Sequence, residues 1–154
     1  MHLSAANVAR SLRELDVAGE ITELPEPAPT AKAAAGQLGC EVGAIANSLV
    51  FSADGEPLLI LTSGAHRVDT GKVAASVGTA ALHRADPDFV LAATGQRIGG
   101  VAPFAHPAPI RTLVDTTLAG FDEIWAAGGV PHAVFPTTFD ELVRITGGTP
   151  ADVA

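Results

Sequence analysis

Apolar and polar residues are arranged along the chain in patterns that predict short helices and strands throughout its length. Near the start, Val8, Leu12 and Leu15 recur at helical spacing, and Ser4 precedes them as a residue that favours the N-cap position. Gly19 follows as a residue that commonly ends a helix. A first helix is therefore expected between Ser4 and Gly19.

Four later segments carry stronger helix signals, because each follows a side chain that can cap its first turn. The caps are Thr30, Asp69, Asp86 and Thr138, and the last of them opens a capping box that ends at Glu141. A proline after Asp86 and glycines beyond the segments support the same boundaries. Helices are expected over residues 31–38, 70–77, 87–94 and 139–146.

The strand signals include one clear hairpin. Ser48–Phe51 and Leu58–Leu61 flank an Asp54-Gly55 pair, which is typical of a tight turn between antiparallel strands. Further strands are expected over residues 21–24, 111–114, 123–126 and 133–135. Because helices and strands are interspersed, the predicted fold class is mixed α/β (α+β), a mixed sheet with flanking helices, in one domain over residues 1–154.

Composition places the chain among small globular proteins. Of its 154 residues, 47% are hydrophobic and 17% are charged, which suffices for one core and not for two domains. No apolar stretch approaches the ~20 residues of a membrane span, and the first residues lack the apolar core of a signal peptide. The single cysteine, Cys40, excludes an internal disulfide and a multi-thiolate metal site. A cytoplasmic protein without membrane contact is expected.

The charge distribution limits how the chain can contact nucleic acid. The net charge of −8 disfavours an extended phosphate-binding surface. Residues 1–56 carry a net charge of −5, residues 57–114 carry +2, and residues 115–154 carry −5. Any affinity for anions is therefore expected in the middle third of the chain, over a small area.

Two loops contain residues suited to ligand binding. Gly99-Gly100, followed by Pro103 and Phe104, makes a rigid loop whose backbone N–H groups are available to a ligand oxygen; the alternative is a plain structural turn. The other loop lies between a strand and a helix, where Arg67 could hold a phosphate or carboxylate. Its alternative is an ion pair of Arg67 with a neighbouring acid.

Signatures of several enzyme classes are missing from the sequence. There is no Gly-x-Ser-x-Gly elbow, no Walker loop and no dinucleotide-binding fingerprint. The five histidines form neither a His-Glu-x-x-His nor a His-x-His pair, so no metal site is expected. The histidines are His2, His66, His83, His106 and His132.

Taken in order along the chain, a set of short motifs resembles the YbaK/EbsC family, which includes the editing domain of bacterial prolyl-tRNA synthetases and its free-standing relatives. The resemblance covers about residues 20–147, and its most specific part is the Gly-Gly-x-x-Pro-Phe loop. The motifs are Thr30–Ala34 with Leu38-Gly39, Ile45–Phe51, Leu61–Gly64 with Arg67–Asp69, Thr94-Gly95 with Gly99–Phe104, Asp115, and Ala127–Gly129.

This resemblance implies a barrel-like, largely antiparallel sheet and hydrolysis of a mischarged aminoacyl-tRNA, such as Ala-, Cys- or Ser-tRNA for proline. It implies the aminoacyl-tRNA 3′ end as a partner, with a synthetase as a second one, and no cofactor and no metal. The catalytic residues that it implies are Asn47, Gly99 and Gly100. The substrate-binding residues that it implies are Thr30, Ser63, Arg67, Val101, Pro103, Phe104, Gly128 and His132. The pocket is expected between the Asn47 strand, the Gly99–Phe104 loop and the Gly128–His132 loop.

One position departs from the family pattern. Asn47 stands where the resembled family usually has lysine, and an amide carries no charge toward a phosphate. Three hypotheses follow: a deacylase that retains activity, a non-catalytic binder of an aminoacyl or nucleotide-like ligand, and a structural partner that docks on a synthetase or on a second copy of itself. Lys32, Arg67 or Lys72 are candidates to supply the missing charge.

Overall fold

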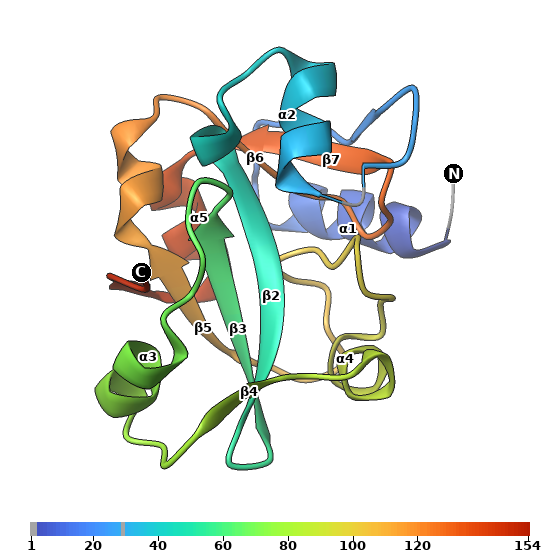
Figure 1. Cartoon of the computed structure of the whole chain (residues 1–154). Helices are drawn as coiled ribbons and strands as arrows, with labels where there is room; N and C mark the ends of the chain where they lie inside the picture. The colour runs from blue at the N-terminus through green and yellow to red at the C-terminus, as the bar shows by residue number, and fades with distance from the viewer. Residues whose placement is uncertain (1–2, 29) are drawn as a thin grey trace.

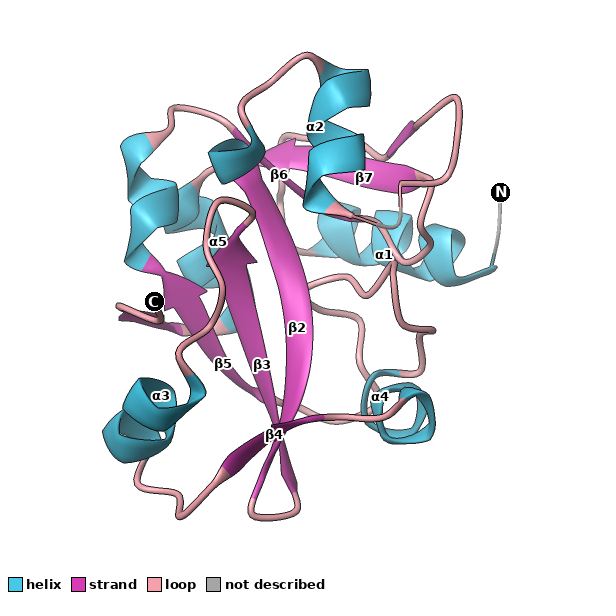
Figure 2. Cartoon of the chain, in the orientation of Figure 1, coloured by secondary structure: helices cyan, strands magenta, loops and turns pink. Residues whose placement is uncertain are grey.

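The computed structural model describes residues 3–28 and 30–154, and side chains are described from Ala5 onward, Pro29 excepted. Figure 1 shows one mixed sheet with helices against it, and Figure 2 separates the two element types by colour. The helices are α1 (Leu3–Glu14), α2 (Ala31–Leu38), α3 (Thr70–Val77), α4 (Pro87–Thr94) and α5 (Phe139–Thr146), with 3-10 turns at Val42–Ala44 and Thr116–Gly120. Among these described helices, none has the length and apolar character needed to cross a bilayer.

The sheet has eight strands in the order β1-β7-β6-β2-β3-β5-β8, and β4 pairs with β2 beside this path. The pairs β2–β6, β3–β5 and β5–β8 are parallel and the other four are antiparallel. The strands are β1 (Thr22–Glu23), β2 (Ile45–Ala53), β3 (Glu56–Ser63), β4 (Leu82–Arg84), β5 (Arg111–Asp115), β6 (Ile124–Ala127), β7 (Ala133–Thr137) and β8 (Thr149–Ala151). The mixed α/β fold with flanking helices is confirmed, but the described strands form an open sheet and not a closed barrel.

The four helices predicted from capping residues are confirmed at their expected bounds. Each cap accepts a hydrogen bond from a backbone N–H in the first turn, at 2.8–3.1 Å. The accepting side chains belong to Thr30, Asp69, Asp86 and Thr138. These side chains satisfy donors that a helix start leaves without partners, which explains why the sequence signal was reliable.

The prediction for the first helix was wrong at both ends. The helix α1 already begins at Leu3, so Ser4 lies inside it, and the Ser4 side chain is outside the described set. The helix ends at Glu14, well before Gly19, because Asp16 adopts a left-handed φ of 56°. Glycine was therefore not needed to stop this helix.

The β2–β3 hairpin forms the centre of the sheet and is confirmed. Asp54 and Gly55 have φ values of 51° and 92°, as a tight turn with two left-handed residues requires. The turn sets a register in which Asn47 pairs with Thr62 and Leu49 with Ile60. Facing residues of an antiparallel pair share one face of the sheet, so Asn47 and Thr62 lie on the same side.

Two apolar clusters hold helices on opposite faces of β2, β3 and β5, which run side by side in the centre of Figure 1. On one face α3 contributes Val73, which packs with Ile60 and Leu113. On the other face α1 and α5 contribute residues that include Val8 and Leu142, each 0% exposed. Burying a side chain of this size contributes roughly 1.5–3 kcal/mol, so both faces of the central strands are firmly fixed.

Candidate active site

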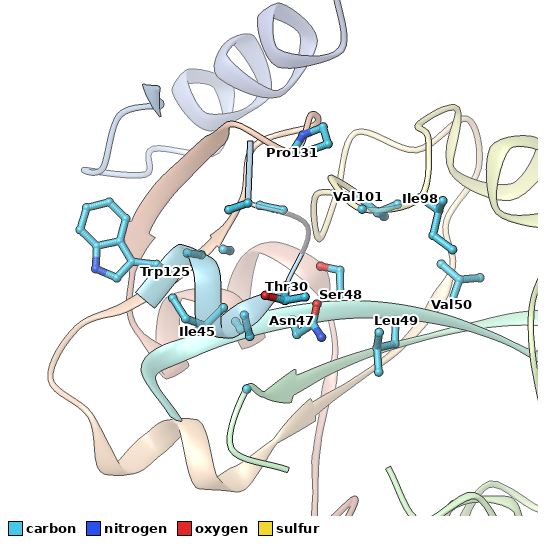
Figure 3. Close-up of a pocket in the computed structure, with 18 of the residues that line it drawn as sticks. Thr30, Ile45, Asn47, Ser48, Leu49, Val50, Ile98, Val101, Trp125 and Pro131 are labelled. Atoms are coloured by element: carbon cyan, nitrogen blue, oxygen red, sulfur yellow. The ribbon is translucent and has the colours of Figure 1, made fainter. Parts of the chain in front are cut away.

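A cavity of about 1000 Å³ opens along β2 where this strand lacks a partner on one side. On that side β6 pairs only with Ile45 and Ala46, and β4 pairs only from Phe51 onward. Residues 47–50, between these two pairings, have no strand partner on this side among the described residues. The cavity is bounded by the start of α2, the loop after β3, the Gly99 loop and the β6–β7 loop, as the labelled side chains in Figure 3 show in part.

The cavity carries positive charge on an acidic protein. Its described lining includes Lys32, Arg67 and Arg84 and contains no aspartate or glutamate. The whole chain has a net charge of −8, so this local imbalance runs against the composition. Low-dielectric walls with charges of one sign concentrate anions in a cleft. Arg67 and Arg84 come from the middle third of the chain, where the sequence predicted the anion affinity.

Asn47 and Ser48 lie at the unpaired part of β2, and both line the cavity. The Asn47 amide makes no hydrogen bond within the described part of the chain and is available to a ligand. Ser48 points to the opposite face of the strand, where its Oγ is buried without a hydrogen-bond partner among the described residues. A buried hydroxyl without a partner costs about 1–3 kcal/mol.

The Gly99 loop forms the wall opposite β2, and the Gln96 side chain holds it in shape. Its Oε1 accepts from the Ala102 N–H at 2.7 Å, and its Nε2 donates to the Phe104 carbonyl at 3.2 Å. Gln96 is 4% exposed, so these bonds are sheltered from water. Gln96 was not among the residues expected in the site, because its sequence neighbours give no sign of where its amide points.

Five of the residues expected in the site line the cavity together. They come from the N-cap of α2, from β2, from the loop after β3 and from the Gly99 loop, which are far apart in sequence. These residues are Thr30, Asn47, Arg67, Gly99 and Val101.

The other six do not line the cavity. Phe104 is 7% exposed and packs edge-on against Phe135 at 5.7 Å, and Pro103 beside it is buried. The Ser63 hydroxyl donates to the Gly43 carbonyl at 2.7 Å. Gly100, Gly128 and His132 support the β6–β7 loop through backbone contacts: the Gly100 carbonyl accepts from Gly129, Gly128 donates to Ala133, and the His132 carbonyl accepts from Leu24.

Gly100→Ala should destabilise the fold, because the Gly100 Cα packs against the backbone of the β6–β7 loop. An added Cβ would lie 2.3 Å from the Val130 carbonyl carbon and 2.6 Å from the Pro131 nitrogen. Forcing this backbone apart costs roughly 1–3 kcal/mol. Gly99→Ala is the matched control: its φ of 95° is strained for alanine, but its nearest contact, Pro131 Cγ, is 3.8 Å away. In urea unfolding, the free energy of unfolding should decrease more for Gly100→Ala than for Gly99→Ala. Equal decreases would contradict the packing argument.

The fold brings together His66 and Asp115, a pair that the sequence analysis did not predict. His66 Nδ1 lies 3.1 Å from Oδ2 of Asp115, across 49 positions of sequence. His66 also lines the cavity. Asp115 ends β5, and His66 lies just beyond the end of the neighbouring strand β3, so the parallel β3–β5 pairing sets them side by side.

The stability of the Gly99 loop should depend on pH through His106. Burial lowers the pKa of His106, although the hydrogen bond between its Nε2 and the Ala102 carbonyl, at 2.9 Å, opposes the shift. The unfolded chain therefore binds this proton more readily, and the stabilisation present above pH ~6.5 is lost as the pH falls below it. Urea unfolding should show that the free energy of unfolding decreases less between pH 7.5 and pH 5.5 for His106→Gln than for the wild type. Equal decreases would show that other groups determine the pH dependence of stability.

Nucleophilic and metal chemistry find little support in the described residues. Burial raises the pKa of the Cys40 thiol, which keeps it protonated and weakly nucleophilic. No group of three metal-binding side chains occurs within residues 3–28 and 30–154. Among the described residues that line the cavity, the polar side chains are one amide, three hydroxyls, three cations, one imidazole and the Trp125 indole.

Comparison with known proteins identifies the family of the chain. A sequence profile of the aminoacyl-tRNA editing domain family matches residues 25–145. The chain is 28% identical to the uncharacterized protein YwhH of Bacillus subtilis over 91% of its own length and 89% of that protein. It is 32% identical to a proline–tRNA ligase of Nitratidesulfovibrio vulgaris over 72% of its own length, which spans 19% of the ligase.

A solved structure extends the likeness to the whole fold. This crystal structure, of a candidate trans-editing enzyme for prolyl-tRNA synthetase, superposes with a TM-score of 0.93 at 41% identity. The superposition covers 99% of this chain and 98% of the other. The chain belongs to the aminoacyl-tRNA editing domain family, the YbaK-like family that its motifs resemble.

Proposed function

We propose that the protein hydrolyses the ester bond of a mischarged aminoacyl-tRNA in the cavity along β2. One observation supports the proposal: in the cavity the charged side chains of the described lining are all cationic, and they lie near an amide and a hydroxyl that have no hydrogen-bond partner among the described residues. An aminoacyl ester is already activated, and the site has to bind it, orient water and stabilise the oxyanion. Family membership supports the same reaction class.

Binding of the tRNA 3′ end falls to the three cations. Lys32, Arg67 and Arg84 reach the cavity from three different elements, which suits a bent terminal nucleotide. Charge-assisted hydrogen bonds to phosphate are roughly twice as strong as neutral ones. The small number of cations predicts weak binding to tRNA alone, so docking on a synthetase through the acidic remainder of the surface is part of the proposal. Such an enzyme would act in the cytoplasm.

Oxyanion stabilisation falls to the Gly99 loop. The backbone N–H groups of Gly99, Gly100 and Val101 make no hydrogen bonds within the described part of the chain, and two of these residues line the cavity. A single well-placed donor in such a hole is worth about 2.7–4 kcal/mol of transition-state stabilisation. The Asn47 amide is a further donor from the opposite wall.

The acyl group would be small. Val50 and Val101 narrow the apolar part of the cavity, and both are at most 5% exposed. One methylene changes binding by only ~1–3 kcal/mol, which is why a separate editing step is useful for near-isosteric amino acids. Alanine, cysteine or serine on the tRNA for proline are the substrates we propose, and the structural neighbour connected to prolyl-tRNA synthetase supports this tRNA.

A second candidate function is binding without catalysis. Its support is Asn47, which lacks the charge that the family pattern has at this position. The same cavity would then hold an aminoacyl or nucleotide-like ligand without hydrolysing it.

Deacylation of a tRNA panel separates the two functions. The panel contains Ala-, Cys- and Ser-tRNA for proline, with correctly charged Pro-tRNA as the control. Under the deacylase proposal, at least one mischarged tRNA loses its amino acid well above the uncatalysed rate and the control does not. Binding of the panel without accelerated release would overturn the deacylase in favour of the binder.

A further inference from the structure

The His66 ring is held on its Nδ1 side and is accessible from the cavity. Its Nδ1 lies 3.1 Å from Oδ2 of Asp115, whose side chain is 1% exposed. The His66 side chain itself is 29% exposed and lines the cavity. A buried carboxylate therefore fixes the orientation of a ring that a cavity-bound ligand can reach.

The partners of Asp115 determine which nitrogen of His66 carries the proton. Oδ2 accepts from the Ser63 N–H at 2.9 Å and from the Thr62 hydroxyl at 3.3 Å, and Oδ1 accepts from the Thr117 N–H at 2.9 Å. A carboxylate surrounded by donors only accepts, so Nδ1 of His66 is the donor toward it. In the neutral ring the lone pair is then on Nε2, which makes no hydrogen bond among the described residues.

The pair lies next to position 47. Asn47 faces Thr62 across the β2–β3 ladder, and the Thr62 hydroxyl contacts Asp115. A side-chain amide such as that of Asn47 does not take up a proton near neutral pH, whereas an imidazole does. The site therefore holds a proton acceptor close to the residue that departs from the family pattern.

The charges around His66 come from several elements. Besides Asp115 at the end of β5, Asp152 follows β8 and is close enough for His66 to contribute to the lowering of its pKa, after the larger effect of Lys72. Lys72 of α3 holds Asp152 at 2.6 Å. Arg67, next in sequence, and Lys32 of α2 line the same cavity. Both acidic and basic side chains therefore surround the His66 ring.

We propose that His66 is the general base of the deacylation, with Asp115 as its positioning residue; this inference rests on the proposed function. Nε2 takes a proton from a water molecule while the water oxygen forms a bond to the ester carbonyl carbon. The tetrahedral intermediate then collapses, the bond from carbon to the ribose oxygen breaks, and Nε2 returns the proton to that oxygen. The products are the free amino acid and a tRNA with its terminal hydroxyl restored.

His66→Asn is the sharpest test, because the asparagine amide can still donate to Asp115 but supplies no base. We expect kcat for the mischarged tRNA to fall about 100-fold or more, the usual contribution of general-base catalysis. The affinity for a non-hydrolysable amide analogue of aminoacyl-adenosine should change less than threefold. The wild-type rate should fall toward acidic pH, because a protonated ring cannot accept the proton of the attacking water, and the variant should lack this fall.

His83→Asn is the matched control, since His83 is exposed on β4 and does not line the cavity. It should keep the wild-type rate and pH profile. A wild-type protein that releases no amino acid from any tRNA of the panel would overturn the proposed function and the base together. An active wild type with an equally active His66→Asn variant, or with the same fall toward acidic pH in that variant, would overturn the role of His66 alone.

Discussion

Asp115→Ala should lower the free energy of unfolding by roughly 3–5 kcal/mol, because several buried donors lose their acceptor at once. The carboxylate accepts from Thr62, Ser63 and Thr117 and binds the His66 ring. These contacts tie β5 to the end of β3, where the chain turns toward the cavity. At about 2–4 °C per kcal/mol for a chain of this size, the melting temperature should fall by about 10 °C.

Two further variants sharpen this expectation. Asp115→Asn keeps the side-chain shape and one carbonyl oxygen but turns an N–H group toward other donors. Its free energy of unfolding should therefore lie between those of the wild type and Asp115→Ala. Asp122→Ala removes an exposed acid from the loop that follows and should leave the melting temperature within about 1 °C. If the melting temperature of Asp115→Ala equals that of Asp122→Ala, the Asp115 carboxylate contributes no net stability. The strand ends are then held by packing alone.

The elements that the sequence predicted well are those whose signals are local. Thr30 and Thr138 cap helices within the same turn that they begin, so neighbouring residues determine the outcome. The Asp54-Gly55 turn likewise needs only two left-handed residues in succession. These features need no tertiary contact to be recognised, and each lies where it was expected.

The elements that were missed depend on partners distant in sequence. The strands β4 and β8 have three residues each and form because β2 and β5 offer free edges. A segment this short carries too few residues for a periodic pattern. The early end of α1 at Glu14 was missed for a different reason: Asp16 takes a left-handed φ although a glycine was available three residues later.

The site was predicted at the level of segments and less well at the level of side chains. Family motifs identified the Gly99 loop, but motifs do not tell a lining residue from a supporting one. Phe104 and Gly100 are packed against Phe135 and Val130, and the cavity is lined instead by their neighbours Gly99 and Val101. The His66–Asp115 pair depends on β3 and β5 lying parallel, a pairing that no local pattern specifies.

Asn47→Lys should raise kcat/KM for a small mischarged aminoacyl-tRNA by about tenfold, because one charged contact to phosphate or ribose is worth ~1–3 kcal/mol. The cavity can accept the new side chain, since its apolar walls can hold the methylene stem while the ammonium reaches the opening. The measurement is the release of alanine, cysteine and serine from tRNA for proline at two salt concentrations. A gain that shrinks at high salt identifies a phosphate contact.

The direction of the change distinguishes a deacylase that has lost the family lysine from a cavity rebuilt for another acyl group. If the cavity has been rebuilt around Asn47 for another acyl group, the substitution places a fourth cation beside Lys32, Arg67 and Arg84 in a lining without acids, and binding of the true ligand falls. Asn47→Gln is the matched control, because it lengthens the side chain without adding charge. If the lysine and glutamine variants both behave as the wild type does, position 47 makes no contact with the substrate. The oxyanion donors that we propose for the Gly99 loop need no lysine, which favours the increase.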